Sequence, residues 1–247
     1  MSVTPTSRRL PHRPGRHWPT RTTLWELDYR GDPIAWWPRV PEWRQPHSVR
    51  VDIDALLDHD APEWLAHTFF QEIETADKHV FEVITTRPTR LRTIIIDREQ
   101  HKRDYADAFD NHPLPGRRSS PAAHEARRRA GTPPRHIWLG VLITNQHDAD
   151  QHIPPLLDTP AAIRFAVVDQ DTPVDLTPWT SAAGCPATPH TCTQPSLDLV
   201  TMTIDETRPL NQTWINDLHT QGEVTNLPVD IHHAPPMRHT VTNGHNR

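Results

Sequence analysis

Apolar and polar residues follow a repeating pattern from residue 49 to about residue 231. Apolar and polar positions alternate at 49–53, and 137–143 is apolar almost throughout, which is typical of a strand buried on both faces. Between such segments apolar residues recur four apart, as at Leu65, Phe69 and Ile73, and this spacing predicts helices. The predicted strands are 49–53, 80–84, 137–143, 163–168, 197–204 and 227–231.

Capping residues predict where several helices begin and end. We expect Asp60 to cap the first helix, because its side chain accepts hydrogen bonds from free backbone N–H groups. Asn145 is expected to cap the helix after the third strand, with Asp148 at the capping-box spacing. A later helix is expected to begin after Asn211 and to end at Gly222, because glycine tolerates the left-handed backbone of a helix end.

Strands and helices alternate along the chain, with one long loop, 170–196, in place of a helix. This order predicts parallel strands joined by crossover helices. An open doubly wound sheet and a partial (β/α) barrel both satisfy the pattern, and periodicity alone does not separate them. In either architecture, chemistry is expected at the carboxyl ends of the strands.

Proline and glycine contents indicate that part of the chain lies outside this α/β domain. Of 247 residues, 27 are proline, 8 are glycine and 35% are hydrophobic, so loose segments are expected around one core. We predict a loose Pro/Arg/Trp-rich arm at 1–42, an α/β domain at 43–233 and a disordered tail at 234–247. Within the domain, the helix that begins at Pro88 is expected to give way to a charged insertion at 98–135.

Charge and cysteine content exclude several classes of protein. The net charge of −5 argues against a nucleic-acid partner, and the arginines at 127–129 are expected to be a solvated charge run. Cys185 and Cys192, with His190 between them, are expected to be free thiols, because zinc sites favour a gap of two to four residues. The sequence contains no apolar segment typical of a secretory signal or a membrane span, so we expect a cytoplasmic protein without a membrane partner.

Polar side chains follow the ends of the predicted strands. Each of them alone is more typical of a helix cap or a turn, but their convergence at one edge favours a shared ligand site. The ligand-binding candidates are Asp54, Arg87, Asn145, Asp169, Asp205 and Arg208. The alternative is a metal-dependent enzyme that uses carboxylate and imidazole ligands. Its candidate metal ligands are Asp169, Asp205, His232 and His233, and its candidate base is Asp54.

Four short runs in the second half of the chain carry a family resemblance. They read IWLGV at 137–141, IPPLL at 153–157, TPAAIRF at 159–165 and PVDL at 173–176. In order and spacing they resemble the uncharacterised phage protein family of gene products 37 and 68, and weaker matches extend the resemblance over 43–230. The resemblance implies a radical-SAM-like domain, which is a partial (β/α) barrel.

The chain departs from that family where a cofactor would bind. The family carries a Cys-x6-Cys-x2-Cys cluster near its N-terminus, and three thiolates hold a 4Fe–4S cluster that leaves one iron open to S-adenosylmethionine. Here no cysteine precedes Cys185, and Thr203 and Ile204 stand where the family has paired glycines. The resemblance therefore implies that the ancestral S-adenosylmethionine and 4Fe–4S cluster are lost, and no cofactor is expected.

The expected function follows from this mixture of matches and losses. We expect a degenerate relative without radical chemistry, which binds a protein partner or a nucleotide-like ligand at the barrel mouth. Two other hypotheses stay open at this point. One is the metal-dependent enzyme, and the other is an active radical enzyme that takes cysteines from a partner chain.

Overall fold

One parallel sheet forms the body of the protein, and its strands lie side by side in the order of the sequence. The computed structural model describes residues 22–26, 45–111, 132–180, 195–205 and 208–233. In this part of the chain the sheet has seven strands, all pairing in parallel. They are β1 (Thr22–Glu26), β2 (Ser48–Asp52), β3 (Val80–Thr85), β4 (Ile137–Ile143), β5 (Ile163–Val168), β6 (Leu199–Ile204) and β7 (Val229–His233).

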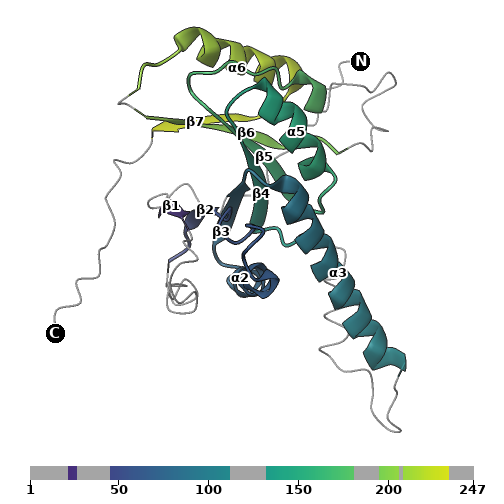
Figure 1. Ribbon diagram of the computed structural model, residues 1–247. Helices are drawn as coiled ribbons and strands as arrows, with labels where there is room; N and C mark the ends of the chain where they lie inside the picture. The colour runs from purple at the N-terminus through teal and green to yellow at the C-terminus, as the bar shows by residue number, and fades with distance from the viewer. Residues whose placement is uncertain (1–21, 27–44, 112–131, 181–194, 206–207, 234–247) are drawn as a thin grey trace, which may run out of the picture.

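The helices lie on the outer side of this sheet (Figure 1). They are α2 (Glu63–Thr75), α3 (Pro88–Asn111), α5 (Gln146–Leu157) and α6 (Gln212–Thr225), and a short 3-10 helix, η2 (Thr177–Trp179), precedes β6. None of the described helices is both long enough and apolar enough to cross a membrane.

The strand order decides between the two architectures that the sequence left open. A doubly wound sheet reverses its strand order at a switch point and carries helices on both faces. Here the order β1 to β7 never reverses, so right-handed crossovers place the helices on one face and the sheet curls into a half-barrel (Figure 1). The predicted partial (β/α) barrel is therefore confirmed.

The main hydrophobic core fills the space between the convex face of the sheet and the helices. Strands β2 to β6 contribute alternate side chains to it, because successive residues of a strand point to opposite faces. From the helices, Phe70, Ile94, Ile153 and Trp214 are almost fully buried in this core. From the strands it receives Val49, Val51, Phe81, Val83, Ile137, Leu139, Val141, Ile143, Ala166, Val168, Val200, Met202 and Ile204.

Two of the predicted helix boundaries are confirmed. The Asn145 side chain accepts a hydrogen bond from the N–H of Asp148 at 2.9 Å, and the Asn211 side chain accepts from the N–H of Trp214 at 3.0 Å. The carboxylate of Asp148 in turn accepts from the N–H of Thr144 at 3.0 Å. Both caps use bonds within four residues, which is why local sequence is sufficient to predict them.

Two other boundary predictions are wrong. Helix α2 has Pro62 at its N-cap and no side-chain cap bond, so Asp60 does not cap it. Helix α6 passes through Gly222 and continues to Thr225, and its C-cap is Asn226, whose φ of 54° supplies the left-handed turn. Glycine is needed at 222 for another reason, because a Cβ there would lie 2.6 Å from Val229 Cγ2 and 2.8 Å from the Leu227 carbonyl oxygen.

The structure also differs from the predicted organisation at two places. Strand β1 pairs with β2 inside the stretch predicted to be a loose arm. Helix α3 continues to Asn111, well into the predicted insertion, and its second half runs out beyond the sheet (Figure 1). Ion pairs support this extension, since Arg98 and Lys102 both reach Glu74 of α2.

Several predictions fall on residues outside those that the structure describes. They concern the rest of the arm (1–21 and 27–42), the arginines at 127–129, the cysteine loop with Cys185, His190 and Cys192, and the tail at 234–247.

Candidate functional site

The carboxyl edge of the sheet holds the residues that the sequence nominated, and most of them bind their neighbours. The Asp54 carboxylate accepts hydrogen bonds from the N–H of Thr86 at 2.8 Å and from the hydroxyls of Thr85 and Thr86. It thereby joins the end of β2 to the start of α3. Arg87 donates to Asp58 at 2.8 Å, and Asn145 caps α5.

Asp169 and Arg208 are brought together by the structure. Arg208 lies 3.1 Å from Asp169 and also donates to Asp171, and these carboxylates raise the pKa of Arg208 above its ordinary value, Asp169 first. Asp205 lies beside them through its backbone, which donates from its N–H to the side chain of the buried Gln170 at 2.6 Å. The cluster links the ends of β5 and β6.

Among the described residues, a set of potential metal ligands does come together, at a place other than the one that the metal-binding alternative predicts. Within the described residues, the group of three side chains that places its ligand atoms within 4.8 Å of one another is Asp58, His59 and Asp60. This trio lies in the loop after β2, and its last two side chains are exposed. It differs from the predicted set of Asp169, Asp205, His232 and His233, and the side chain of His233 lies outside the described structure.

A polar cluster lies inside the half-barrel, and of its members the sequence nominated only His232, as a candidate metal ligand. The cluster consists of Arg50, Glu82, Thr201, Thr203 and His232, and we call it the lumen cluster. The guanidinium of Arg50 donates to the Glu82 carboxylate at 2.7 and 2.9 Å, and both residues are less than 10% exposed. The same guanidinium donates to Thr203 at 3.1 Å and to Thr201 at 3.3 Å.

These bonds cross the concave side of the sheet. Arg50 lies on β2 and the two threonines lie on β6, and three other strands separate β2 from β6 within the sheet. The contacts therefore join strands that are not neighbours. Because a charge taken out of water is costly unless it is paired, the Glu82 carboxylate is what permits Arg50 to occupy this position.

The hydrogen bonds of His232 define its tautomer. Its Nε2 lies 3.2 Å from Nη1 of Arg50 and 3.0 Å from Oγ1 of Thr203. A guanidinium only donates, so Nε2 of His232 accepts and the ring proton lies on Nδ1. Both of these contacts of the His232 ring are thus made through Nε2.

Apolar side chains complete the inner face next to the lumen cluster. They are Ile84, Trp138, Ile163, Phe165, Val167 and Leu199. The ring of Phe165 lies directly over Gly140, where a methyl group would come within 2.4–2.6 Å of three ring atoms. The glycine in the IWLGV run is thus the residue that lets an aromatic ring fill the inner face.

Alternation along β2 and β6 was the signal that could have located the lumen cluster. Arg50 and Asp52 occupy every second position of β2, and Thr201 and Thr203 do the same on an otherwise apolar β6. In a doubly wound parallel sheet, helices would cover this face as well. Only the curvature of the sheet turns them toward one another.

Comparison with known families adds one finding to this geometry. The model of a family described as "Protein of unknown function (DUF5131)" matches residues 7–231, which is most of the chain. The chain belongs to this family. Neither the curated proteins nor the solved structures contain a significant match. Membership in DUF5131 thus does not indicate an activity, because the function of the family is unknown.

The donor groups of this DUF5131 protein do not fit a 4Fe–4S cluster. Such a cluster with one open iron requires three thiolates, and the chain has two cysteines, Cys185 and Cys192. The inner face instead presents a guanidinium, a carboxylate, hydroxyls and an imidazole, and the last three kinds of group all bond to the guanidinium of Arg50. These groups suit a closed polar network better than a site for a cluster.

Proposed function

We propose that this DUF5131 protein is a phage-type, radical-SAM-like binding domain that has lost 4Fe–4S and S-adenosylmethionine chemistry. The observation that carries the proposal is the lumen cluster, because the side chain of Arg50 spans the inner face and bonds to residues of β3, β6 and β7. The half-barrel retains its shape while side chains of the chain itself bond to one another across its inner face.

The position of Thr203 supports the loss of the cofactor. The family resemblance places paired glycines at 203 and 204, where a bare backbone admits a ligand closely. In this chain the Thr203 hydroxyl occupies that position and bonds both Arg50 and His232. A side chain therefore stands in space that glycine would leave open.

Binding remains the function that this scaffold supports, at the carboxyl edge of the strands. In parallel α/β folds the loops at this edge form the ligand site. The candidate residues there are Asp54, Arg87, Asn145, Asp169, Asp205 and Arg208. Of these, Arg87 lines an open groove.

The test is the iron and sulfide content of protein purified without oxygen, together with a calorimetric titration with S-adenosylmethionine. We expect far less than one iron per chain and no binding heat from S-adenosylmethionine. About four irons with matching sulfide per chain would overturn the proposal. A Cys185→Ser/Cys192→Ser variant is the control, since iron that survives in it is not held by thiolates of this chain.

A further inference from the structure

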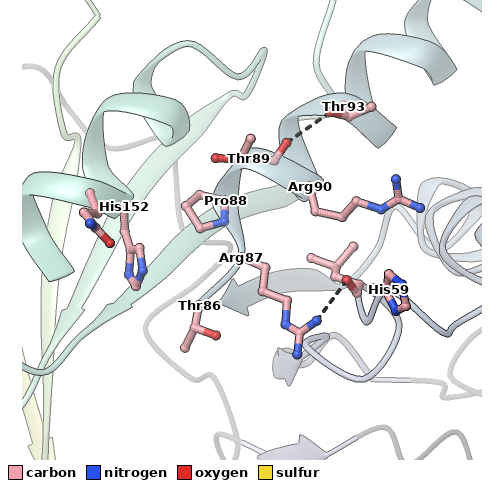
Figure 2. A pocket seen from close by; sticks show the side chains of 10 residues that line it. His59, Thr86, Arg87, Pro88, Thr89, Arg90, Thr93 and His152 are labelled. Atoms are coloured by element: carbon pink, nitrogen blue, oxygen red, sulfur yellow. Dashed lines mark hydrogen bonds between the residues drawn. The ribbon is translucent and has the colours of Figure 1, made fainter.

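A groove of about 760 Å³ opens at the carboxyl edge, outside the lumen. Three parts of the chain line it: the loop after β2, the start of α3 and the middle of α5 (Figure 2). Its volume falls in the range of small-molecule sites. Its lining combines apolar surface with polar and basic side chains, and Arg87, Arg90, His59 and His152 are among the latter.

The two arginines give the groove its chemical character. Arg87 and Arg90 extend from the start of α3 toward the side of His59, and His152 stands beyond Pro88 on the opposite side (Figure 2). A guanidinium presents several donors in a fixed plane, which suits the oxygens of a phosphate group. Two of them in one groove favour an anionic ligand.

Each arginine already has a carboxylate partner, and both partners are replaceable. Arg87 pairs with Asp58 at 2.8 Å, and Arg90 pairs with Glu63 at 3.2 Å. In both pairs every side chain is between 39% and 52% exposed. Exposed pairs of this kind are held weakly, so a ligand with several anionic oxygens competes with them effectively.

Hydroxyl and imidazole groups surround the arginines. Thr86, Thr89 and Thr93 line the groove beside them. The His152 ring is held by its Nδ1, which lies 3.2 Å from the carbonyl oxygen of Leu142. When Nδ1 donates to that carbonyl, Nε2 is the ring nitrogen left for a ligand.

We propose that this groove binds a small anion that carries a diphosphate group, with Arg87 and Arg90 as the anchoring residues. The inference rests on the proposed binding function and names its ligand class. The loss of either arginine removes charge-assisted hydrogen bonds, whereas the loss of Asp58 releases Arg87 from a competitor.

The test is a calorimetric titration of the full chain with pyrophosphate, ADP and adenosine. We expect pyrophosphate and ADP to bind and adenosine not to bind. Arg87→Gln and Arg90→Gln should each weaken pyrophosphate binding about tenfold or more. Asp58→Asn should strengthen it by up to about fivefold, because the exposed ion pair no longer competes.

Arg103→Gln is the matched control, because it removes the same charge from an exposed position of α3 that does not line the groove. Thermal melting shows that each variant is folded, and an unfolded Arg87→Gln or Arg90→Gln protein leaves Asp58→Asn as the deciding variant. The proposal is overturned if pyrophosphate does not bind at about 10 mM. It is also overturned if Arg103→Gln weakens binding as much as the groove variants, or if Asp58→Asn has no effect.

The outcomes of this titration and of the iron measurement can be told apart. If the chain lacks iron and pyrophosphate does not bind, only the groove inference is wrong. If iron and sulfide are found while pyrophosphate binds at Arg87 and Arg90, the loss of radical chemistry is wrong and the groove remains.

Discussion

The two faces of one sheet are built by opposite means. On the convex face, neighbouring strands present aliphatic and aromatic side chains to the helices, and any one of them touches many others. On the concave face, an ion pair and its hydrogen-bonded partners lie beside a smaller apolar cluster. Adjacent residues of one strand are therefore buried in different surroundings: Glu82 lies in the polar lumen cluster, and Val83 lies in the apolar core on the convex face.

Because of this difference, the two faces are expected to lose stability in different ways when residues are substituted. An apolar core loses stability in proportion to the methyl groups removed and the cavity left. A buried charged pair responds in a different way, because removal of one partner leaves the other charge buried without compensation. We therefore expect the lumen cluster to be most sensitive to the loss of one charged partner, and the convex core to the loss of side-chain volume.

The largest expected effect comes from breaking the ion pair of the lumen cluster. Glu82→Gln keeps the size of the side chain but leaves Arg50 uncompensated, so we expect a loss of about 3–5 kcal/mol in the free energy of unfolding. Val83→Ala, at the next residue and on the convex face, should cost about 2 kcal/mol. Urea denaturation of both variants measures the comparison directly.

The paired replacement Arg50→Met/Glu82→Leu sharpens the same test. Because it removes both charges, it should recover most of the stability that Glu82→Gln loses. If Glu82→Gln costs less than Val83→Ala, the two faces do not differ as argued.

An intermediate effect is expected at the apolar part of the inner face. Gly140→Ala forces a methyl group against the ring of Phe165, which should cost about 1–3 kcal/mol. The double variant Gly140→Ala/Phe165→Leu should be less unstable than the sum of its two single variants, because the smaller side chain removes the clash. Strict additivity in urea denaturation would contradict this packing.

The smallest effect is expected at the carboxyl edge, where the two faces meet solvent. The pKa of Asp148 lies below its ordinary value of 3.8, mainly because its carboxylate accepts a hydrogen bond from the Thr144 hydroxyl. This interaction therefore stabilises the fold above about pH 4, and its contribution is lost as the pH falls through the lowered pKa of the folded state.

Thr144→Val should remove that contribution and reduce the free energy of unfolding at pH 7 by less than about 1 kcal/mol, since Asp148 is only partly buried and solvent screens the interaction. Stability measured from pH 6 down to pH 2 should then fall less steeply in the variant than in the parent protein. An unchanged slope would mean that the hydroxyl does not act on Asp148.

Local patterns were sufficient wherever the deciding interactions are local. The strands at 137–143 and 163–168 are found with the predicted bounds, because their apolar runs end at polar residues. The caps at Asn145 and Asn211 were predictable because each bond spans three residues. Helix α6 was predicted to end too early, because Gly222 is explained by the later residues Leu227 and Val229.

The candidate site was less predictable than the fold. Asp169 and Arg208 were placed at one edge correctly, because parallel strands bring their carboxyl ends together. Asp54 and Asn145 were also placed at this edge, but their side chains are used by the adjoining turn and helix. Of the basic residues that line the groove, the sequence nominated only Arg87. Arg90 and His152 lie on two different helices, and the periodicity of a sequence does not show how two helices are placed relative to each other.

The sequence by itself determined the alternation of strands and helices, the family and the lack of three cysteines for a cluster, because each of these is written in local pattern or composition. Only the tertiary structure decided that the sheet curls into a half-barrel and that Arg50 forms hydrogen bonds with Glu82, Thr203 and His232. The physical reason is distance along the chain. Arg50 and His232 are separated by 182 positions, and no local propensity encodes a contact that depends on the curvature of the whole sheet.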